Sequence, residues 1–314
     1  MLDVLIVNYN TSQLLKPMFA ALDSATENIN SKYWVVDNAS RDNSVDVLRR
    51  EFPHVGLEVN ATNIGFGRAN NQLLKNVLGQ YVLLLNTDAF VSADTVKKTL
   101  HYMQSHPDCG LLGVKLVGRD GALQPSCRYF PTPWNTFLSR TGLSKYLPKT
   151  QMVDNQDWNP NVEQECDWVP GCYYLIRREV LDDVGLFDPR YFLYCEEVDH
   201  CKRVKKAGWK VIYFPDTTVI HIGGESAKSD AALSAAGKQI SDLQLESELL
   251  YFRKHHGLSG VLQHMILTTG GGIYQLLKSL IRRKGWRVAR SNLYHFLQTL
   301  ALCWRTRFGA RATR

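Results

Sequence analysis

The sequence predicts an α/β protein with a mostly parallel sheet and helices on both faces of that sheet. Strand-like and helix-like segments alternate along the first half of the chain, which is the order typical of parallel sheets. The apolar run Tyr81–Leu85 is too short for a typical helix and indicates a fully buried strand. The chain has 314 residues, 45% of them hydrophobic, which is enough for one large core and an appendage.

The alternation can be followed element by element. Short apolar runs predict the strands, and the segments between them predict the helices. The predicted strands are Asp3–Tyr9, Lys32–Asp37, Val55–Asn60 and Tyr81–Leu85. The predicted helices that follow them are Ser12–Thr26, Asn43–Phe52, Ala69–Val77 and Ala93–Ser105.

The pattern changes after Cys109. Gly118–Glu165 is rich in Pro, Gly, Trp and Asn and is expected to be irregular, and Glu225–Lys238 is rich in Ala and Ser and is expected to be mobile. The other predicted elements are the strands Gly110–Val117, Trp168–Arg177 and Trp209–Ile220, the last interrupted at Pro215, and the helices Arg178–Val184 and Glu196–Ala207. The remainder is helical by period, so we expect a domain at 1–225 and a helical extension at 226–314.

Cysteine usage and the N-terminus predict a cytoplasmic protein. The seven cysteines form no C-x-x-C pair, which argues against a zinc cluster and against a disulfide framework. Met1–Val7 leads directly into a strand without a basic leader, so we expect no secretion. No uninterrupted apolar stretch reaches the ~18 residues of a spanning helix, so an integral membrane protein is not expected.

Charge is distributed very unevenly along the chain. After Glu248 there is no acidic residue and there are twelve Lys and Arg, whereas the formal net charge of the whole chain is +7. The extension is therefore strongly basic and the rest of the chain is mildly acidic. This asymmetry indicates a polyanionic surface as a partner, either nucleic acid or anionic lipid.

The last predicted helix, Asn292–Arg305, is basic and amphipathic. Basic amphipathic helices with Trp and Phe commonly lie flat in anionic membrane interfaces. In the alternative interpretation, the apolar stripe packs on the domain or on a second subunit of a homodimer. The stripe consists of Leu293, Phe296, Leu297, Leu300, Ala301 and Trp304.

Polar loops follow four of the predicted strands. They are Asn8-Tyr9-Asn10, Asp37-Asn38-Ala39-Ser40, Asn63-Ile64-Gly65-Phe66-Gly67 and Asn86-Thr87-Asp88. Ligands of open α/β sheets bind beyond the carboxyl ends of the strands. We therefore expect the four loops to form one site.

Asp88 is the candidate metal ligand. A carboxylate at the end of a strand, with polar Asn86 two residues before it, can hold a divalent cation against a diphosphate. Mg²⁺ and Mn²⁺ suit such a site because phosphates and waters can fill their remaining positions. Alternatively, Asp88 caps the helix that follows. His221, at the end of the strand Thr217–Ile220, is a candidate second ligand, although a lone His is more often structural.

The second and third polar loops indicate a nucleotide pocket. Asp37 could accept a hydrogen bond from the imide N–H of uracil or thymine, or it could organise an Asx turn. The segment Gly65-Phe66-Gly67 lacks the third glycine of a dinucleotide fingerprint. We interpret it as a tight turn whose amides, with Asn63, Asn70 and Asn71, face a sugar nucleotide. An ordinary helix entry with Asn caps is the alternative.

Glu196 and Glu197 are the candidate catalytic acids. Mutual repulsion and partial burial would raise one pKa above the ~4.3 of free Glu, which suits a general base. Acids in the first turn of a helix also favour the helix dipole, so a structural role is the alternative. Asp199 and Arg203 stand four residues apart and could form an ion pair.

Together these motifs resemble the inverting glycosyltransferases of family 2, which have the GT-A fold. Within that family the chain looks most like the bacterial rhamnosyltransferase-type enzymes that build surface polysaccharides on lipid-linked acceptors. The resemblance spans about residues 1–225. Its matching stretches are Val4–Asn10, Val35–Ser44, Asn63–Asn71, Leu83–Phe90, Val169–Arg178 and Phe187–Gly224.

The resemblance implies a fold and an activity. The fold would be a mostly parallel, Rossmann-like sheet followed by the basic helical extension. The activity would be inverting transfer of a sugar from a nucleoside diphosphate, by likeness dTDP-rhamnose, to a hydroxyl of a glycan linked to a polyprenyl diphosphate. UDP-sugars are the alternative donors. A cytoplasmic enzyme, peripheral at the inner face of the cytoplasmic membrane, would fit this activity.

The resemblance also assigns roles to residues. Glu197 would be the base and Glu196 its neighbour, although the family usually has Asp at the second position. Asp88 and His221 would bind the metal, with Asn86 in place of the first acid of the D-x-D motif. Trp168 and Gly171 match the stretch that meets the acceptor. The donor would be bound by Asn8, Tyr9, Asp37, Asn38, Asn63, Gly65, Phe66, Asn70, Asn86 and Asp88.

Two hypotheses from other classes compete with this one. A nucleotidyltransferase would also use a nucleotide pocket and magnesium, but Asn8-Tyr9-Asn10 offers no basic clamp for phosphates. A nucleic-acid-binding protein would explain the basic extension. It leaves Asp88 and Glu197 without a role, and the sequence has no recognisable nucleic-acid-binding motif, so no nucleic-acid partner is expected.

Overall fold

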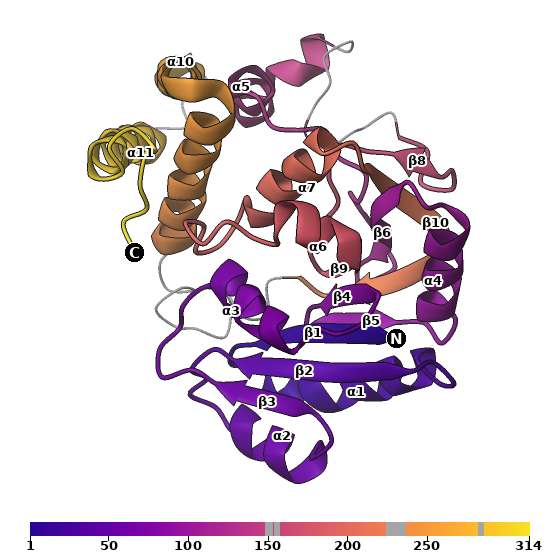
Figure 1. The fold of residues 1–314 in the computed structure, drawn as a ribbon. Coiled ribbons are helices and arrows are strands. Elements are labelled where there is room, and N and C mark those ends of the chain that lie inside the picture. Colours follow the sequence, from indigo (N-terminus) through magenta and orange to yellow (C-terminus); the bar gives the residue numbers. More distant parts are fainter. Residues whose placement is uncertain (148–152, 154–157, 224–236, 282–285) are drawn as a thin grey trace.

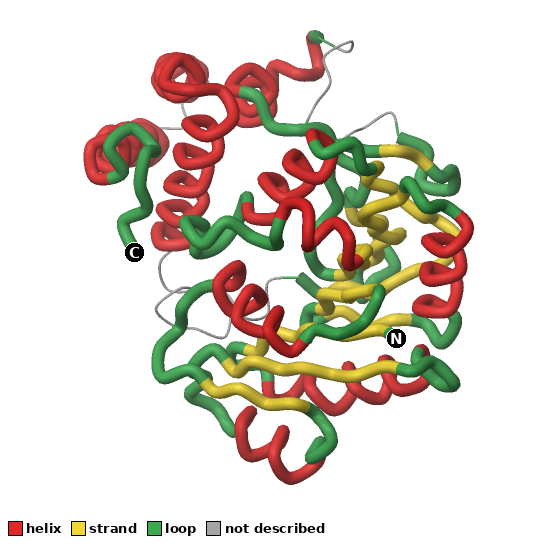
Figure 2. Tube along the Cα trace, in the orientation of Figure 1, coloured by secondary structure: helices red, strands yellow, loops and turns green. Residues whose placement is uncertain are grey.

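The computed structural model describes residues 1–314 except 148–152, 154–157, 224–236 and 282–285. One twisted sheet runs through the molecule, and helices cover it on two sides (Figures 1 and 2). The C-terminal helices lie together at one side of the sheet. In the described part of the chain, no helix is both long enough and apolar enough to cross a membrane.

The sheet is mixed, and the first four strands of the chain pair with one another in parallel. Its main path runs in the order β3-β2-β1-β4-β9-β6-β10-β5, with β7 paired to β6 and β8 paired to β10. β9 is antiparallel to both of its neighbours, and β5 is antiparallel to β10. The strands are β1 Leu2–Asn8, β2 Ser31–Asp37, β3 Gly56–Val59, β4 Tyr81–Leu85, β5 Ala89–Val91, β6 Cys109–Val117, β7 Leu123–Gln124, β8 Gln164–Glu165, β9 Tyr173–Arg177 and β10 Lys210–His221.

Helices connect most of these strands. The α-helices are α1 Ser12–Ala25, α2 Ser44–Glu51, α3 Phe66–Leu73, α4 Thr95–Ser105, α5 Pro133–Thr141, α6 Arg178–Val184, α7 Glu196–Lys206, α10 Gly237–Ile281 and α11 Trp286–Arg305. Two short 3₁₀ helices are η1 Leu74–Asn76 and η2 Leu143–Tyr146. α10 contains a sharp kink, because the backbone of Gly257 has φ 67° and is not helical there.

Alternate residues of the central strands face two separate cores. Val4 and Ile6 of β1 pack with α1, α2 and α4, whereas Leu5 packs with α3, α6 and α7 on the other face. This division follows from the two-residue period of a strand. All five residues of β4 are buried, as predicted for a central strand covered on both faces.

Several predicted boundaries differ from the structure. α3 begins at Phe66 and not at Ala69, because Gly65 adopts φ 89° and turns the chain directly into the helix. β9 begins at Tyr173 and not at Trp168, because Pro170 and Gly171 interrupt the strand. β10 continues through Pro215, and a shift in its register with β6 between Phe214 and Thr218 absorbs the interruption.

The prediction that Gly118–Glu165 is irregular is wrong in part. This segment contains β7, α5 and β8. α5 had a sequence signature: Thr132 and Asn135 form a reciprocal capping box, and Pro133 occupies the first helical turn. Residues 225–236 of the segment predicted to be mobile lie outside the described residues, and Gly237 begins α10.

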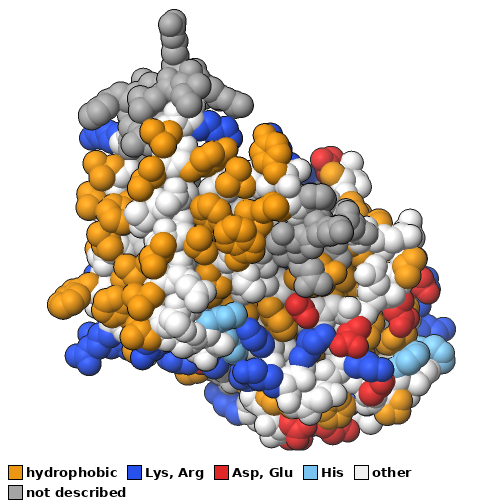
Figure 3. Space-filling model, turned by 90° about the horizontal axis from the view of Figure 1, so that it is seen from above, with side chains coloured by type: hydrophobic (Ala, Val, Ile, Leu, Met, Phe, Trp, Pro, Cys, Tyr) orange, Lys and Arg blue, Asp and Glu red, His pale blue; other side chains and the backbone are white. Residues whose placement is uncertain are grey.

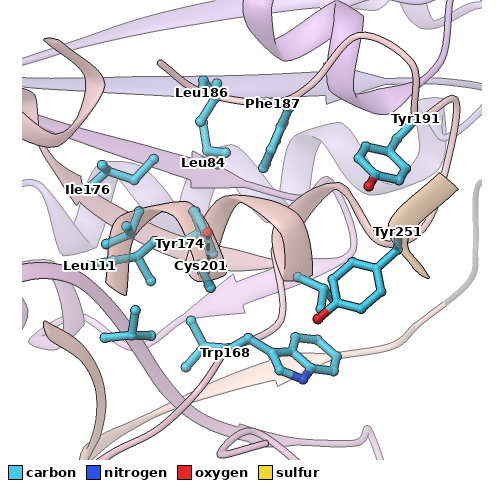
Figure 4. Close-up of a cluster of buried hydrophobic side chains, with 14 of the residues drawn as sticks. Leu84, Leu111, Trp168, Tyr174, Ile176, Leu186, Phe187, Tyr191, Cys201 and Tyr251 are labelled. Carbon is cyan, nitrogen blue, oxygen red and sulfur yellow. Dashed lines mark hydrogen bonds between the residues drawn. The ribbon is translucent and has the colours of Figure 1, made fainter. Parts of the chain in front are cut away.

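The C-terminal helices join the core of the preceding domain. Leu249, Tyr251 and Phe252 of α10 are fully buried in the same cluster as Tyr174 of β9 and Val198 of α7. Figure 4 shows the side chain of Tyr251 within this cluster. The segment predicted as an extension therefore contributes to the core of the domain that it follows.

A buried ion cluster also fastens α10 to α7. Asp199 of α7 is fully buried and accepts hydrogen bonds from Arg203 Nε at 2.9 Å, Lys254 Nζ at 2.8 Å and His255 Nε2 at 2.7 Å. The predicted pair of Asp199 with Arg203 is thus confirmed. Burial alone would raise the pKa of Asp199, but the hydrogen bonds from His255 and Lys254 outweigh it and lower this pKa to about 2.

We predict that Asp199→Asn lowers the free energy of unfolding by about 3 kcal/mol at neutral pH, because the cations around it lose their partner. The folded pKa of Asp199 lies below the unfolded value of about 3.9, so its contribution is present above that pH and is lost as pH falls toward about 2. Denaturant titrations at a series of pH values measure both effects.

Asp182→Asn is the matched control, because Asp182 is exposed and pairs with the partly exposed Arg178 at 3.1 Å. This control should change stability by less than about 1 kcal/mol. Equal effects of the two substitutions would contradict the role of the buried cluster.

Candidate active site

A pocket of about 330 Å³ opens beyond the carboxyl ends of β1 and β4. All four polar loops supply lining residues, and the first of them contributes Tyr9. The pocket is lined by Val7, Tyr9, Asn38, Asn63, Gly65, Phe66, Asn86, Thr87, Asp88, Pro170, Gly171, Cys172, Phe192, Leu193, Tyr194, Glu196, Glu197, His221 and Leu243.

Most residues predicted from the sequence as site residues line this pocket. They are Tyr9, Asn38, Asn63, Gly65, Phe66, Asn86, Asp88, Gly171, Glu196, Glu197 and His221. Five predicted residues, Asn8, Asp37, Asn70, Asn71 and Trp168, lie outside the lining. The amide of Asn71 instead binds the backbone of Phe187, donating to its carbonyl at 2.6 Å and accepting from its N–H at 3.0 Å. The sequence analysis missed Leu243 of α10, for which the sequence carries no local signal.

Asp37 and Asn8 form the wall behind the pocket. Both are fully buried, and Asn8 Nδ2 donates to Asp37 Oδ2 at 2.7 Å. Asp37 Oδ1 accepts from the backbone N–H of Ser40 at 2.9 Å. The local turn considered as the alternative role of Asp37 is therefore present, and it holds together the loops after β1 and β2.

Asn70 and Trp168 are both buried outside the pocket lining. Asn70 is buried in α3, and its Nδ2 donates to the carbonyl of Phe66 at 3.0 Å. Trp168 is buried, donates from Nε1 to the carbonyl of Tyr129 at 2.9 Å, and has the guanidinium of Arg128 4.8 Å above its ring. Asn70 therefore supports the lining residue Phe66, whereas the contacts of Trp168 are to residues that do not line the pocket.

Asn38 connects two of the polar loops. Its Nδ2 donates to Asn63 Oδ1 at 2.8 Å, and its Oδ1 accepts from the backbone N–H of Ile64 at 3.1 Å. Gly65 then approaches the backbone of Phe192 so closely that a Cβ atom would lie 2.4 Å from its carbonyl oxygen. Together with its φ of 89°, this contact makes glycine necessary at position 65.

Asp88 and His221 meet because β5 pairs with β10. In this antiparallel ladder Ala89 lies opposite His221, and the backbone N–H of Ile222 donates to the carbonyl of Asp88 at 3.0 Å. His221 Nε2 then lies 3.6 Å from Asp88 Oδ1, and Asp88 Oδ2 accepts from the N–H of Gly223 at 3.1 Å. Because β5 follows Asp88 directly, Asp88 does not cap α4.

The donor set at Asp88 and His221 fits a divalent cation. The side chains supply one carboxylate and one imidazole. Over the described residues, no group of three or more His, Cys, Asp or Glu side chains could hold a metal alone. The remaining ligands would have to come from phosphates and water, as is usual for Mg²⁺ sites. Burial lowers the pKa of His221 despite the opposing charge of Asp88, which favours the neutral imidazole that metals require.

The pocket as a whole is acidic. Asp88, Glu196 and Glu197 line it, and no Lys or Arg does so in the part of the chain that the structure describes. A diphosphate would therefore meet like charge unless a cation entered with it. This charge balance is a second reason why the pocket fits a metal.

The two glutamates start α7 after an unusual turn. Tyr194 and Cys195 have φ values of 71° and 64°, which are rare for residues other than glycine and cluster at functional sites. The turn directs Glu196 and Glu197 into the pocket. Within the described chain, Oε2 of each has no hydrogen-bond partner.

The environments of the two glutamates differ. Burial, and then the charge of Glu197, raise the pKa of Glu196 well above its ordinary value. Burial also raises the pKa of Glu197, but backbone hydrogen bonds to its carboxylate and the positive charge of Arg128 oppose this rise. These interactions favour the ionised form of Glu197 over that of Glu196, and the pair holds one proton over a range of pH.

Comparisons with known proteins agree with these features. The profile of glycosyl transferase family 2 matches residues 3–185. An N-acetylglucosaminyl-diphospho-decaprenol L-rhamnosyltransferase of Mycobacterium tuberculosis is 29% identical over 249 residues, covering 74% of this chain and 79% of the relative. The rhamnosyltransferase WbbL of Escherichia coli K12 is 25% identical over 244 residues, covering 73% of this chain and 86% of the relative.

Solved structures show the same fold. The mannosyltransferase PcManGT from Pyrobaculum calidifontis, in complex with GDP-Man and Mn²⁺, superposes with a TM-score of 0.55 at 14% identity. The match covers 98% of this chain and 87% of that protein. At this identity the comparison supports the fold alone.

We predict that Glu197→Gln lowers the pKa of Glu196, because the charge of Glu197 is one of the two causes that raise it. Burial remains, so the pKa of Glu196 should stay above the ~4.3 of free Glu. Carboxyl ¹³C shifts followed over pH measure the change. In the control Glu165→Gln, at an exposed residue paired with Lys205, Glu196 should titrate as in the unmodified protein. An unchanged Glu196 titration in Glu197→Gln would show that the two carboxyls do not interact.

Proposed function

The chain belongs to glycosyl transferase family 2, and we propose that it moves rhamnose from dTDP-rhamnose to a hydroxyl of a lipid-linked glycan. The family predicted from the sequence motifs is confirmed, and so is the α/β fold of its GT-A members. The two rhamnosyltransferases reported above support the choice of sugar, and the name of the mycobacterial relative supports a diphospho-polyprenol acceptor. UDP-sugars are the alternative donors.

One observation carries the proposal: a single pocket contains both the candidate metal site and the candidate base. Asp88 and His221 line one part of it, and Glu197 lines another. Asp88 and His221 would hold Mg²⁺ or Mn²⁺, which when bound neutralises the charge of the leaving diphosphate. The absence of Lys and Arg from the described lining disfavours the rival nucleotidyltransferase, whose phosphates would need a basic clamp.

The donor would extend along the polar loops. Its nucleotide would lie beside Asn38, Asn63 and Phe66, with Asp37 and Asn8 supporting that wall from behind. Asn86 and Asp88 would meet the diphosphate end. The acceptor would enter beside Gly171, where the buried ring of Trp168 supports the segment.

Glu197 is the proposed general base. Of the two glutamates it ionises first, so it can accept the proton of the attacking hydroxyl while Glu196 stays protonated. A protonated Glu196 can donate a hydrogen bond to a sugar oxygen. No side chain forms a covalent intermediate with the sugar in this proposal. The acceptor hydroxyl attacks the anomeric carbon directly, the nucleoside diphosphate leaves, and the configuration of that carbon inverts.

We expect Glu197→Gln to retain affinity for the nucleoside diphosphate while turnover falls by ~10²-fold or more, the scale of a lost general base. The candidate donors dTDP-rhamnose and UDP-sugars are tested with Mn²⁺ or Mg²⁺, and product formation is followed by NMR, which also reports the anomeric configuration.

In the unmodified enzyme, turnover should fall as pH drops through the raised pKa of Glu197, because the protonated form cannot act as a base.

Glu165→Gln serves as the control for a neutralised exposed glutamate and should turn over normally. Turnover of Glu197→Gln comparable to that of the unmodified enzyme would reassign the base. Retention of configuration would reject the single displacement.

The exposed face of the C-terminal helices is the proposed membrane contact. In α11, Leu297 is 53% exposed and Trp304 is 78% exposed, whereas Leu302 and Cys303 are buried. Most of the predicted apolar stripe is therefore exposed, whereas Phe296 is half-buried and lines a second pocket between α5, α10 and α11. α10 adds Leu262, Ile266, Ile273 and Leu277 as further exposed apolar residues. Figure 3 shows hydrophobic side chains gathered on the face that is seen from above, with Lys and Arg at its edges.

The charge of this region favours an anionic lipid surface over a second copy of the chain. Arg290, Arg305 and Arg307 are exposed beside the apolar face, and the sequence has no acid after Glu248. An apolar face with a basic border suits the interface of an anionic bilayer. Such contact, at the inner face of the cytoplasmic membrane, would bring the pocket to a lipid-linked acceptor.

We predict that the protein floats with vesicles containing anionic phosphatidylglycerol and that high salt weakens this binding. The double variant Leu297→Ser/Trp304→Ser should bind less, because it removes apolar surface from the face. Leu78→Ser is the control, since Leu78 is 72% exposed but lies outside the C-terminal helices. Equal flotation of the two variants would reject the lipid contact, and a dimer lost only in the double variant would assign the face to a second copy.

A further inference from the structure

Gln124 contacts His221 at two points. It lies in β7, which a tight turn at Gly118 and Gly121 pairs with the end of β6. Its Nε2 donates to the backbone carbonyl of His221 at 2.7 Å. Its Oε1 lies 2.9 Å from His221 Nδ1. The side-chain amide therefore spans both the backbone and the ring of a single residue.

This double contact determines which ring nitrogen carries the proton. A backbone carbonyl can only accept a hydrogen bond, so the amide must place its NH₂ group toward the carbonyl of His221. Its oxygen then faces Nδ1. Because that oxygen can only accept, Nδ1 of His221 must carry the hydrogen.

The tautomer has a consequence for Asp88. With the hydrogen on Nδ1, the neutral ring presents the Nε2 lone pair toward Asp88 Oδ1, 3.6 Å away. Two acceptors then face each other across a partly buried gap. The side chain of Asp88 is only 9% exposed and that of His221 only 18% exposed, so water screens this repulsion poorly. A cation between the two atoms would relieve it.

We propose that Gln124 is the positioning residue of the metal site: it holds His221 in the Nδ1–H tautomer so that Nε2 is ready to bind the cation. The inference rests on the proposed function of Asp88 and His221. Metal-binding histidines commonly donate their second N–H to such a partner, and loss of the partner typically costs ~10–100-fold in metal affinity. Gln124 lies outside the pocket lining, so it acts only through His221.

The first test is the tautomer in the metal-free protein. Long-range ¹H–¹⁵N spectra, recorded at a pH where the ring is neutral, distinguish Nδ1–H from Nε2–H, and the spectrum of His221→Asn identifies the signal. We expect Nδ1–H in the unmodified protein. An Nε2–H ring would overturn the inference. This readout requires neither metal nor turnover, so it is independent of the proposed function.

The second test compares Gln124→Leu with Gln164→Leu. The amide of Gln164 likewise donates to a backbone carbonyl, that of Asn159, but Gln164 lies in β8 and does not line the pocket. Binding of Mn²⁺ in the presence of nucleoside diphosphate is measured by the electron paramagnetic resonance of free Mn²⁺. We expect affinity to fall ~10–100-fold in Gln124→Leu and to stay unchanged in Gln164→Leu.

Unchanged Mn²⁺ affinity in folded Gln124→Leu would overturn the inference. If that variant does not fold, the tautomer of His221 in the unmodified protein still tests the inference. A protein that shows the Nδ1–H tautomer but no transferase activity would keep the role of Gln124 in orienting His221 and reject the proposed function, so the two failures are distinguishable.

Discussion

The pairing of β5 with β10 is the constraint on which the candidate site depends. Asp88 belongs to the first part of the chain and His221 to the last strand of the sheet, yet the register that places Ala89 opposite His221 brings them together. The backbone contact of Ile222 with Asp88 and the two contacts of Gln124 then limit the movement of both side chains. The ladder thus supplies the preorganisation that a metal site requires.

The second organising principle is charge. Three acids line the pocket, and no Lys or Arg is among the described lining residues. Such a site would oppose an anionic ligand by itself and would accept it together with a cation. The same acidity separates the two glutamates, since burial and repulsion keep Glu196 protonated while Glu197 ionises first. The charge of a bound donor, the charge of a metal ion and the protonation of the two glutamates would therefore depend on one another within this cavity.

The C-terminal helices pack with α7, the helix that begins with the two glutamates. Leu243 of α10 lines the pocket, and Ser247 Oγ donates to the carbonyl of Leu193 at 2.8 Å, in the segment that leads to the glutamates. Lys254 and His255 bind Asp199 of α7. The part of α10 before Gly257 thus packs against α7 and the turn that carries Glu197, while the part after Gly257 and α11 present the exposed apolar face. If the exposed apolar face bound a membrane, the turn that carries Glu197 would lie at a fixed position relative to the membrane surface.

The sequence by itself determined the class of the protein, because the signals are local. The run Tyr81–Leu85 specified a buried strand, and polar residues at strand ends specified one site edge, since side-chain periodicity and the geometry of parallel sheets act over a few residues. Tertiary structure alone decided that Asp37 lies behind the pocket, that Leu243 lines it and that Gln124 orients His221. These facts depend on strand register and on helix docking between residues far apart in the chain, which leave no local pattern to detect.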